Sequence, residues 1–157
     1  MTVNIGISDD DRQRVVAILN TLLADEFLLY TKTRNFHWNV TGPQFNDLHK
    51  FFEAQYEALD DTIDEVAERA RALGGRAHGT LEEFRNGARL GEKPGAVPPA
   101  RDMLATLLAD HEALIRSLRE DITTVNDRHR DVGTADFLTG LLEQHEKAAW
   151  MLRSFLA

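Results

Sequence analysis

The sequence contains no cysteine. This absence excludes disulfide bonds, thiolate-ligated zinc and iron–sulfur clusters, and it leaves the redox compartment open. Proline is scarce, with 4 residues among 157, and no apolar run approaches the length of a membrane span. The first residues also lack the basic and apolar segments of a signal peptide, so a cytoplasmic location is the default expectation.

Positive charge is also in short supply. The formal net charge is −8, and neither end carries a lysine-rich arm. Three consecutive aspartates, Asp9 to Asp11, precede the first arginine. An acidic protein repels phosphate backbones unless it has a local basic segment. The composition therefore favours cations over nucleic acid as partners and predicts weak DNA binding or none.

Helical periodicity dominates the rest of the chain. Residues 1–157 are expected to form a single domain with residues 1–8 as a short N-terminal extension, since the 43% apolar and 28% charged content is that of one globular unit. Apolar residues recur at helical spacing in four long segments, without strand alternation. The prediction is an all-α four-helix bundle, with helices from Ser8/Asp9 to about His37, from about Gln44 to Leu73, and around Met103–Val125 and Phe137–Phe155.

The connections between these segments differ in length. Gly74 and Gly75 are expected to close the second helix as left-handed caps, and Gly133-Thr134 is expected to separate the third helix from the fourth. The glycine- and proline-rich stretch 74–100 is too long for a tight hairpin, and Thr80-Leu-Glu-Glu83 is a capping box that predicts a short extra helix within it. Such a long crossover lets the third helix run parallel to the second, as in ferritin-like bundles.

The second helix carries a stripe of residue types that bind metals. At about 100° per residue, the stripe falls within roughly 100° of arc and comprises His49, Glu53, Asp60, Asp64 and Glu68. Along the axis, however, Glu53 and Asp64 are about 16 Å apart, too far to share one metal. An antiparallel two-fold mate would place His49 and Glu53 of one chain beside Asp64 and Glu68 of the other. The spacing therefore predicts a metal site at a dimer interface.

Two alternatives bear on this stripe. A run of acids is more often a solvated face, yet the same helix has an extensive apolar surface that must be partly covered, and a His/carboxylate pair four residues apart suits Fe, Mn or Zn. His37 could add a third ligand. The Glu-x-x-His motif of intra-bundle di-iron sites is absent, and His111 and His145 fall on or beside core stripes, where a structural role is expected.

The run Asn35-Phe36-His37-Trp38-Asn39-Val40-Thr41-Gly42-Pro43-Gln44-Phe45-x-x-Leu48-His49-x-x-Phe52 resembles the Dps family of miniferritins. Asp64-x-x-Ala67-Glu68-Arg69, Leu73-Gly74-Gly75 and later segments at 133–136 and 146–152 extend the resemblance over nearly the whole chain. It implies a hollow homododecamer that oxidises Fe(II), preferably with hydrogen peroxide, stores ferric mineral and protects against oxidative stress.

The same resemblance assigns roles to residues. A di-iron ferroxidase site would take His37, His49 and Glu53 from one subunit and Asp64 and Glu68 from its two-fold mate, with zinc or manganese as candidate competitors. The family usually has Asp at position 53. Trp38 would be the aromatic beside the site, a sink for stray oxidising equivalents.

Two further expectations come from the family. Acids near the junction of the last two helices would line pores through which iron enters, namely Asp127, Asp131 and Asp136, although a solvated loop is the alternative. Many relatives compact DNA through lysine-rich tails, so a DNA-compacting protein with secondary iron oxidation is the alternative function. This chain has no such tail.

Overall fold

The structure is a computed structural model that describes residues 3–157; Met1 and Thr2, at the start of the predicted N-terminal extension, lie outside the described residues. Over this range the chain forms helices and no strands. They are α1 (Asp9–Asn39), α2 (Phe45–Ala72), α3 (Leu81–Gly87), α4 (Ala100–Asp127) and α5 (Val132–Leu156). The predicted all-α fold is confirmed.

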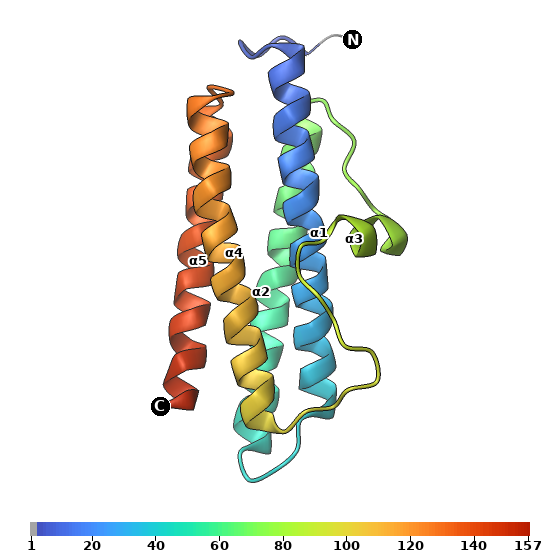
Figure 1. The fold of residues 1–157 in the computed structure, drawn as a ribbon, viewed down its shortest axis with the longest axis vertical. Helices are drawn as coiled ribbons and strands as arrows, with labels where there is room; N and C mark the ends of the chain where they lie inside the picture. Colours follow the sequence, from blue (N-terminus) through green and yellow to red (C-terminus); the bar gives the residue numbers. More distant parts are fainter. Residues whose placement is uncertain (1–2) are drawn as a thin grey trace.

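The four long helices form two antiparallel pairs, α1 with α2 and α4 with α5 (Figure 1). Helices α2 and α4 point in the same direction, because the segment between them returns along the outside of α1 and carries the short helix α3 (Figure 1). This is the ferritin-like arrangement that the long crossover predicted. The core between the pairs is built mainly from fully buried leucines, with Phe52 and Met103.

The starts of α1 and α3 follow the capping signals in the sequence. Ser8 caps α1, where its hydroxyl accepts a hydrogen bond from the Asp11 amide at 3.1 Å. Thr80 and Glu83 form the predicted capping box of α3. In both cases a side-chain oxygen satisfies an amide that the first turn of a helix leaves without a backbone partner.

The glycines after α2 have two different roles. Gly74 adopts the left-handed conformation, with φ at +82°, as predicted for a cap. Gly75 does not, so its assignment as a left-handed cap was wrong. A Cβ at Gly75 would lie 2.4 Å from Cγ1 of Val16, so position 75 requires glycine because α1 passes too close for a side chain.

The break between α4 and α5 lies earlier than predicted. Helix α5 begins at Val132, which places Gly133 and Thr134 in its first turn rather than between the helices. Asp131 is the reason, because its side chain accepts a hydrogen bond from the Thr134 amide at 2.9 Å and so caps the helix. The chain reverses at Arg130, which has a positive φ of 54°.

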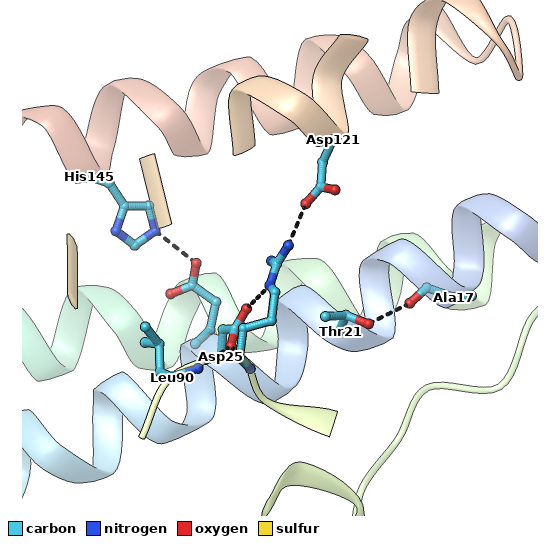
Figure 2. A network of polar contacts seen from close by, with 8 residues as sticks. Ala17, Thr21, Asp25, Leu90, Asp121 and His145 are labelled. Carbon is cyan, nitrogen blue, oxygen red and sulfur yellow. Dashed lines mark hydrogen bonds and ion pairs between the residues drawn. The ribbon is translucent and has the colours of Figure 1, made fainter. Parts of the chain in front are cut away.

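The crossover is held against the bundle by a buried carboxylate on α1. Asp25 is fully buried and accepts hydrogen bonds from the backbone amides of Arg89 and Leu90 at 2.6 and 3.1 Å. The Arg89 side chain bridges Asp25, at 2.7 Å, and Asp121 of α4, at 3.3 Å (Figure 2). These contacts fix the crossover across α1 and α4. Among the described helices, none is both long enough and apolar enough to cross a membrane.

Candidate metal centre

His37 and His49 meet where α1 turns into α2. Helix α1 continues to Asn39, a turn at Gly42 with φ of +115° reverses the chain, and α2 begins at Phe45. His37 therefore lies in the last turn of α1 and His49 in the second turn of α2. Their imidazole rings stack with centroids 3.8 Å apart and 19° between the planes. The turn between α1 and α2 thus brings together two histidines whose sequence separation is 12 positions.

Each histidine is held by the backbone of the other. The distance from Nδ1 of His37 to the carbonyl oxygen of His49 is 2.8 Å, and from Nδ1 of His49 to the carbonyl oxygen of His37 it is 2.9 Å. A carbonyl oxygen only accepts, so each Nδ1 carries the hydrogen and donates it. In the neutral ring, Nε2 then has a free lone pair. This is the arrangement by which proteins fix a histidine as a metal ligand.

Tyr56 connects this histidine pair with Glu53. Its ring meets His37 edge-on, with centroids 5.2 Å apart, and its hydroxyl lies 3.5 Å from Oε1 of Glu53. Burial and the nearby Glu53 carboxylate raise the pKa of the Tyr56 phenol, so it keeps its proton and can donate to Glu53 near neutral pH. Glu53 is thereby oriented from within its own helix.

Sequence reasoning missed three residues around this pair. Tyr56 lies three positions after Glu53 and so shares its helix face, which was a usable signal. Phe45 stacks on His49 with centroids 5.1 Å apart. The Arg34 guanidinium lies over the rings of Trp38 and Tyr56, at 5.4 and 4.8 Å from their centroids. Phe45 lies four positions before His49 on α2, so its helical spacing was also a usable signal. The contact of Arg34 with Tyr56 carried no such signal, because it depends on how α1 and α2 pack.

An apolar surface surrounds the histidines in the isolated chain. Trp38 is 64% exposed and Phe45 is 47% exposed, and both flank the stacked rings in sequence. Large aromatic side chains at this level of exposure are typical of a surface that another protein chain covers. This surface lies at the same end of α2 as His49 and Glu53.

The remaining predicted ligands lie elsewhere on α2. Asp64 and Glu68 are exposed on the same continuous helix, as is Asp60, so the spacing of about 16 Å between positions 53 and 64 holds. Across residues 3–157, no group of three or more His, Asp or Glu side chains lies close enough to hold a metal ion. The five predicted ligands therefore do not form a complete site within one chain.

The three predicted pore acids differ in their surroundings. Asp127 and Asp136 are exposed on either side of the α4–α5 junction. Asp131 is buried at 3% exposure, where it caps α5 and pairs with Arg69 at 3.2 Å. Asp131 thus has a structural role in the chain, whereas the lining of a pore by these acids stays a prediction.

Comparison with known proteins identifies the family. The ferritin-like domain family matches residues 16–157. The chain is 52% identical over 98% of its length to a low-temperature-induced protein of Nostoc, of which it covers 86%. It is 36% identical over 92% of its length to DNA protection during starvation protein 2 of Bacillus anthracis, of which it covers 97%.

Solved structures of Dps proteins have the same fold as this chain. A Dps protein from Bacillus brevis superposes with a TM-score of 0.90 at 35% identity, over 96% of this chain and 100% of that one. A Dps protein from Vibrio cholerae, described as a member of the ferritin-like diiron-carboxylate superfamily, gives a TM-score of 0.92 at 29% identity, over 100% of this chain and 98% of that one. The chain therefore belongs to the Dps family of ferritin-like proteins.

Proposed function

We propose that this chain is the subunit of a ferroxidase and iron-storage shell that oxidises Fe(II) with hydrogen peroxide. The observation that carries the proposal is the reciprocal hydrogen bonding of His37 and His49, at 2.8 and 2.9 Å. Two backbone carbonyls hold both rings in the form that leaves Nε2 free to bind iron. A merely structural histidine pair has no need of that form, because its rings could bond to each other or to water.

The chemistry follows from the ligand types. Neutral Nε2 of His37 and His49 would bind Fe(II), and the carboxylates would favour the ferric product through their negative charge. Two Fe(II) ions held close together each give up one electron, and one hydrogen peroxide accepts both, so its O–O bond breaks and two hydroxides form. A single iron would supply only one electron and release hydroxyl radical. The ferric ions then hydrolyse to the oxyhydroxide that the shell stores.

The second half of the site would come from a two-fold mate. Asp64 and Glu68 are exposed and too far along α2 to reach the histidines of their own chain. In an isologous dimer each chain offers both halves of the site, so one antiparallel contact creates two complete sites. The exposed Trp38 and Phe45 beside the histidines supply the apolar surface that such a contact would bury. Six such dimers would give the homododecamer expected of the family.

Three further roles belong to the same proposal. Trp38, next to His37, would take up stray oxidising equivalents. Asp127, Asp131 and Asp136 would line pores through which Fe(II) enters, with Asp127 and Asp136 the more accessible of the three. Zinc and manganese would compete for the site, since two imidazoles with carboxylates suit all three metals. The site would operate in the cytoplasm.

The test is an anaerobic titration of the native assembly with Fe(II), followed by peroxide. We expect rapid appearance of ferric absorbance in the wild type, and loss of that rapid phase in His49→Ala and in Asp64→Ala. His78→Ala is the matched control, because His78 lies in the crossover away from the site, and it should oxidise iron normally. Equal rates in all four proteins would refute the proposal.

DNA compaction is the alternative function, and the charge distribution argues against it. The net charge of the 157 residues is −8, and negative charge opposes contact with phosphate backbones. A gel-shift assay at low salt without divalent cations distinguishes the two, since salt dependence makes low salt the most permissive condition for phosphate contacts. Clear retardation of duplex DNA would favour the alternative.

A further inference from the structure

A groove enters the bundle between α2 and α5, away from the predicted metal site. It has a volume of about 340 Å³. On α2 the groove residues lie on the opposite side of the helix, roughly 180° around from the stripe of His49, Glu53 and Asp64. Three alanines in the walls, Ala54 and Ala58 of α2 and Ala148 of α5, explain the hollow, because their short side chains leave the space between the two helices unfilled.

The rim and the floor of the groove differ in chemistry. Its rim includes the exposed residues Ala54, Ala58, Gln144 and Met151. Its floor reaches the bundle axis and comprises buried side chains, namely Gln55, Leu59, Thr62, His111 and His145. The wall is mostly apolar, and polar side chains lie both at the deepest part and at the rim, where Gln144 and Lys147 are exposed.

Several polar atoms of the floor have no hydrogen-bond partner among the described residues. They are Nε2 of His111 and both amide atoms, Oε1 and Nε2, of Gln55. Gln55 is 9% exposed and His111 is 2% exposed. Buried polar groups in native proteins are almost always hydrogen-bonded, and each one left without a partner is destabilising. Three such atoms beside one hollow indicate that something else supplies their partners.

A chain of hydrogen bonds fixes the orientation of His111. Glu26 of α1 is fully buried, and its Oε1 lies 2.8 Å from Nε2 of His145 (Figure 2). Nδ1 of His145 in turn lies 2.9 Å from Nδ1 of His111. One hydrogen is shared between these two Nδ1 atoms. The chain thus uses Nδ1 of His111 and leaves its Nε2 as the free atom.

The same chain determines what His111 can offer a ligand. Burial, and then the neighbouring His145, lower the pKa of His111 well below its ordinary value, so its ring is neutral near pH 7. If His111 holds the shared hydrogen, its Nε2 accepts; if His145 holds it, Nε2 of His111 carries a hydrogen and donates. A hydroxyl group suits both cases, because it can donate and accept. A carboxylate or an ether can only accept.

We propose that this groove binds a small uncharged hydroxylated aromatic compound, a phenol in the simplest case, with its hydroxyl at Nε2 of His111 and the amide of Gln55. The ring would lie between Phe51, Leu59 and Met151. The sulfur of Met151 makes favourable contacts with aromatic rings, and the volume falls within the usual range of small-molecule sites. A metal is the poorer fit, since no three His, Asp or Glu side chains converge anywhere in residues 3–157. This site is independent of iron oxidation.

Calorimetric titration of the metal-free native assembly with phenol and with benzene tests the proposal. Phenol should bind about tenfold more tightly than benzene, because only phenol can hydrogen-bond to the buried polar atoms. Gln55→Leu should reduce this preference to about threefold or less, because it removes one of the two partners while keeping the size of the side chain.

Ala58→Leu supplies a second test that does not depend on the polar floor. Leucine at this exposed rim position fills the groove without altering the core, so both ligands should bind at least about tenfold more weakly. Ala72→Leu is the matched control, because Ala72 is exposed on the same helix but lies outside the groove, and it should bind like the wild type. Equal affinity for phenol and benzene in the wild type, no binding of phenol, or unchanged binding in Ala58→Leu would each overturn the proposal.

Discussion

A shared ferroxidase site makes a quantitative prediction about mixed assemblies. His49→Ala removes one half of each site and Asp64→Ala removes the other, so each variant alone should lose rapid oxidation. In a dimer that contains one chain of each kind, the chain with Asp64→Ala supplies an intact His49 and the chain with His49→Ala supplies an intact Asp64. One of the two sites is then complete and the other lacks both residues.

Random pairing of equal amounts sets the magnitude. About half of the dimers would be mixed, and half of their sites would be complete, so the assembly should recover about a quarter of the wild-type activity per subunit. The two variants would be co-expressed with different affinity tags and purified through both tags, and peroxide-driven Fe(II) oxidation would be followed by stopped-flow absorbance. Double-tag purification enriches mixed shells, so the subunit ratio is measured by mass spectrometry and the expected fraction is calculated from it.

The matched control is a mixture of His37→Ala with His49→Ala. Both substitutions damage the same half of the site, so no pairing of the two chains yields a complete set of ligands, and activity should not return. Recovery in this control, or no recovery in the first mixture, would refute the two-chain site. Recovery to the full wild-type level would also contradict it, because at most half the sites of a mixed dimer can be complete.

Further predictions concern packing, pH and DNA. Gly75→Ala should destabilise the fold by about 1–3 kcal/mol, because the new Cβ would lie 2.4 Å from Val16. Urea unfolding measures the loss of stability, and adding Val16→Ala should restore part of it. Gly79→Ala is the control and should cost less stability, because a Cβ at position 79 meets nothing within 4 Å. The hydrogen bond from Arg76 lowers the pKa of Glu83 from 4.5 to about 2. A lowered folded-state pKa stabilises the protein above about pH 4.5, and this contribution is lost as the pH falls toward about 2; the stability advantage of the wild type over Glu83→Gln should therefore shrink between about pH 6 and about pH 3, and an unchanged advantage would contradict the ion pair. In a low-salt gel shift, adding the protein should not slow the migration of duplex DNA, because the net charge of the protein is −8.

Local signals in the sequence predicted most of the fold. Ser8 and the Thr80/Glu83 capping box mark helix starts at the observed positions, because capping involves only residues within one turn. The length of the crossover predicted that α4 would run parallel to α2. The prediction failed at Gly133, which lies inside α5, because the cap at Asp131 is reinforced by Arg69 from a different helix.

The ligand stripe on α2 illustrates how far sequence alone reaches. The fixed rise and rotation of a helix are enough to place His49, Glu53, Asp64 and Glu68 on one face and too far apart for one metal. Residue type and position already made His37, at the end of another helix, a possible third ligand, and the family resemblance assigned it the same role. Sequence alone could not determine the protonation of the histidines, because the carbonyls that fix it belong to the opposite end of the turn between α1 and α2.

Tertiary structure alone decided the remaining features. Tyr56 meets His37 only because α1 and α2 pack side by side, and Arg34 covers Tyr56 for the same reason. The groove above Gln55 exists because two helices far apart in sequence leave a gap at their alanines. The sequence by itself thus determined the helices, the N-terminal caps of α1 and α3 and the ligand stripe, since these follow from the local geometry of the chain. Ring orientations, aromatic contacts and the groove depend on distances between helices, which no spacing within one helix specifies.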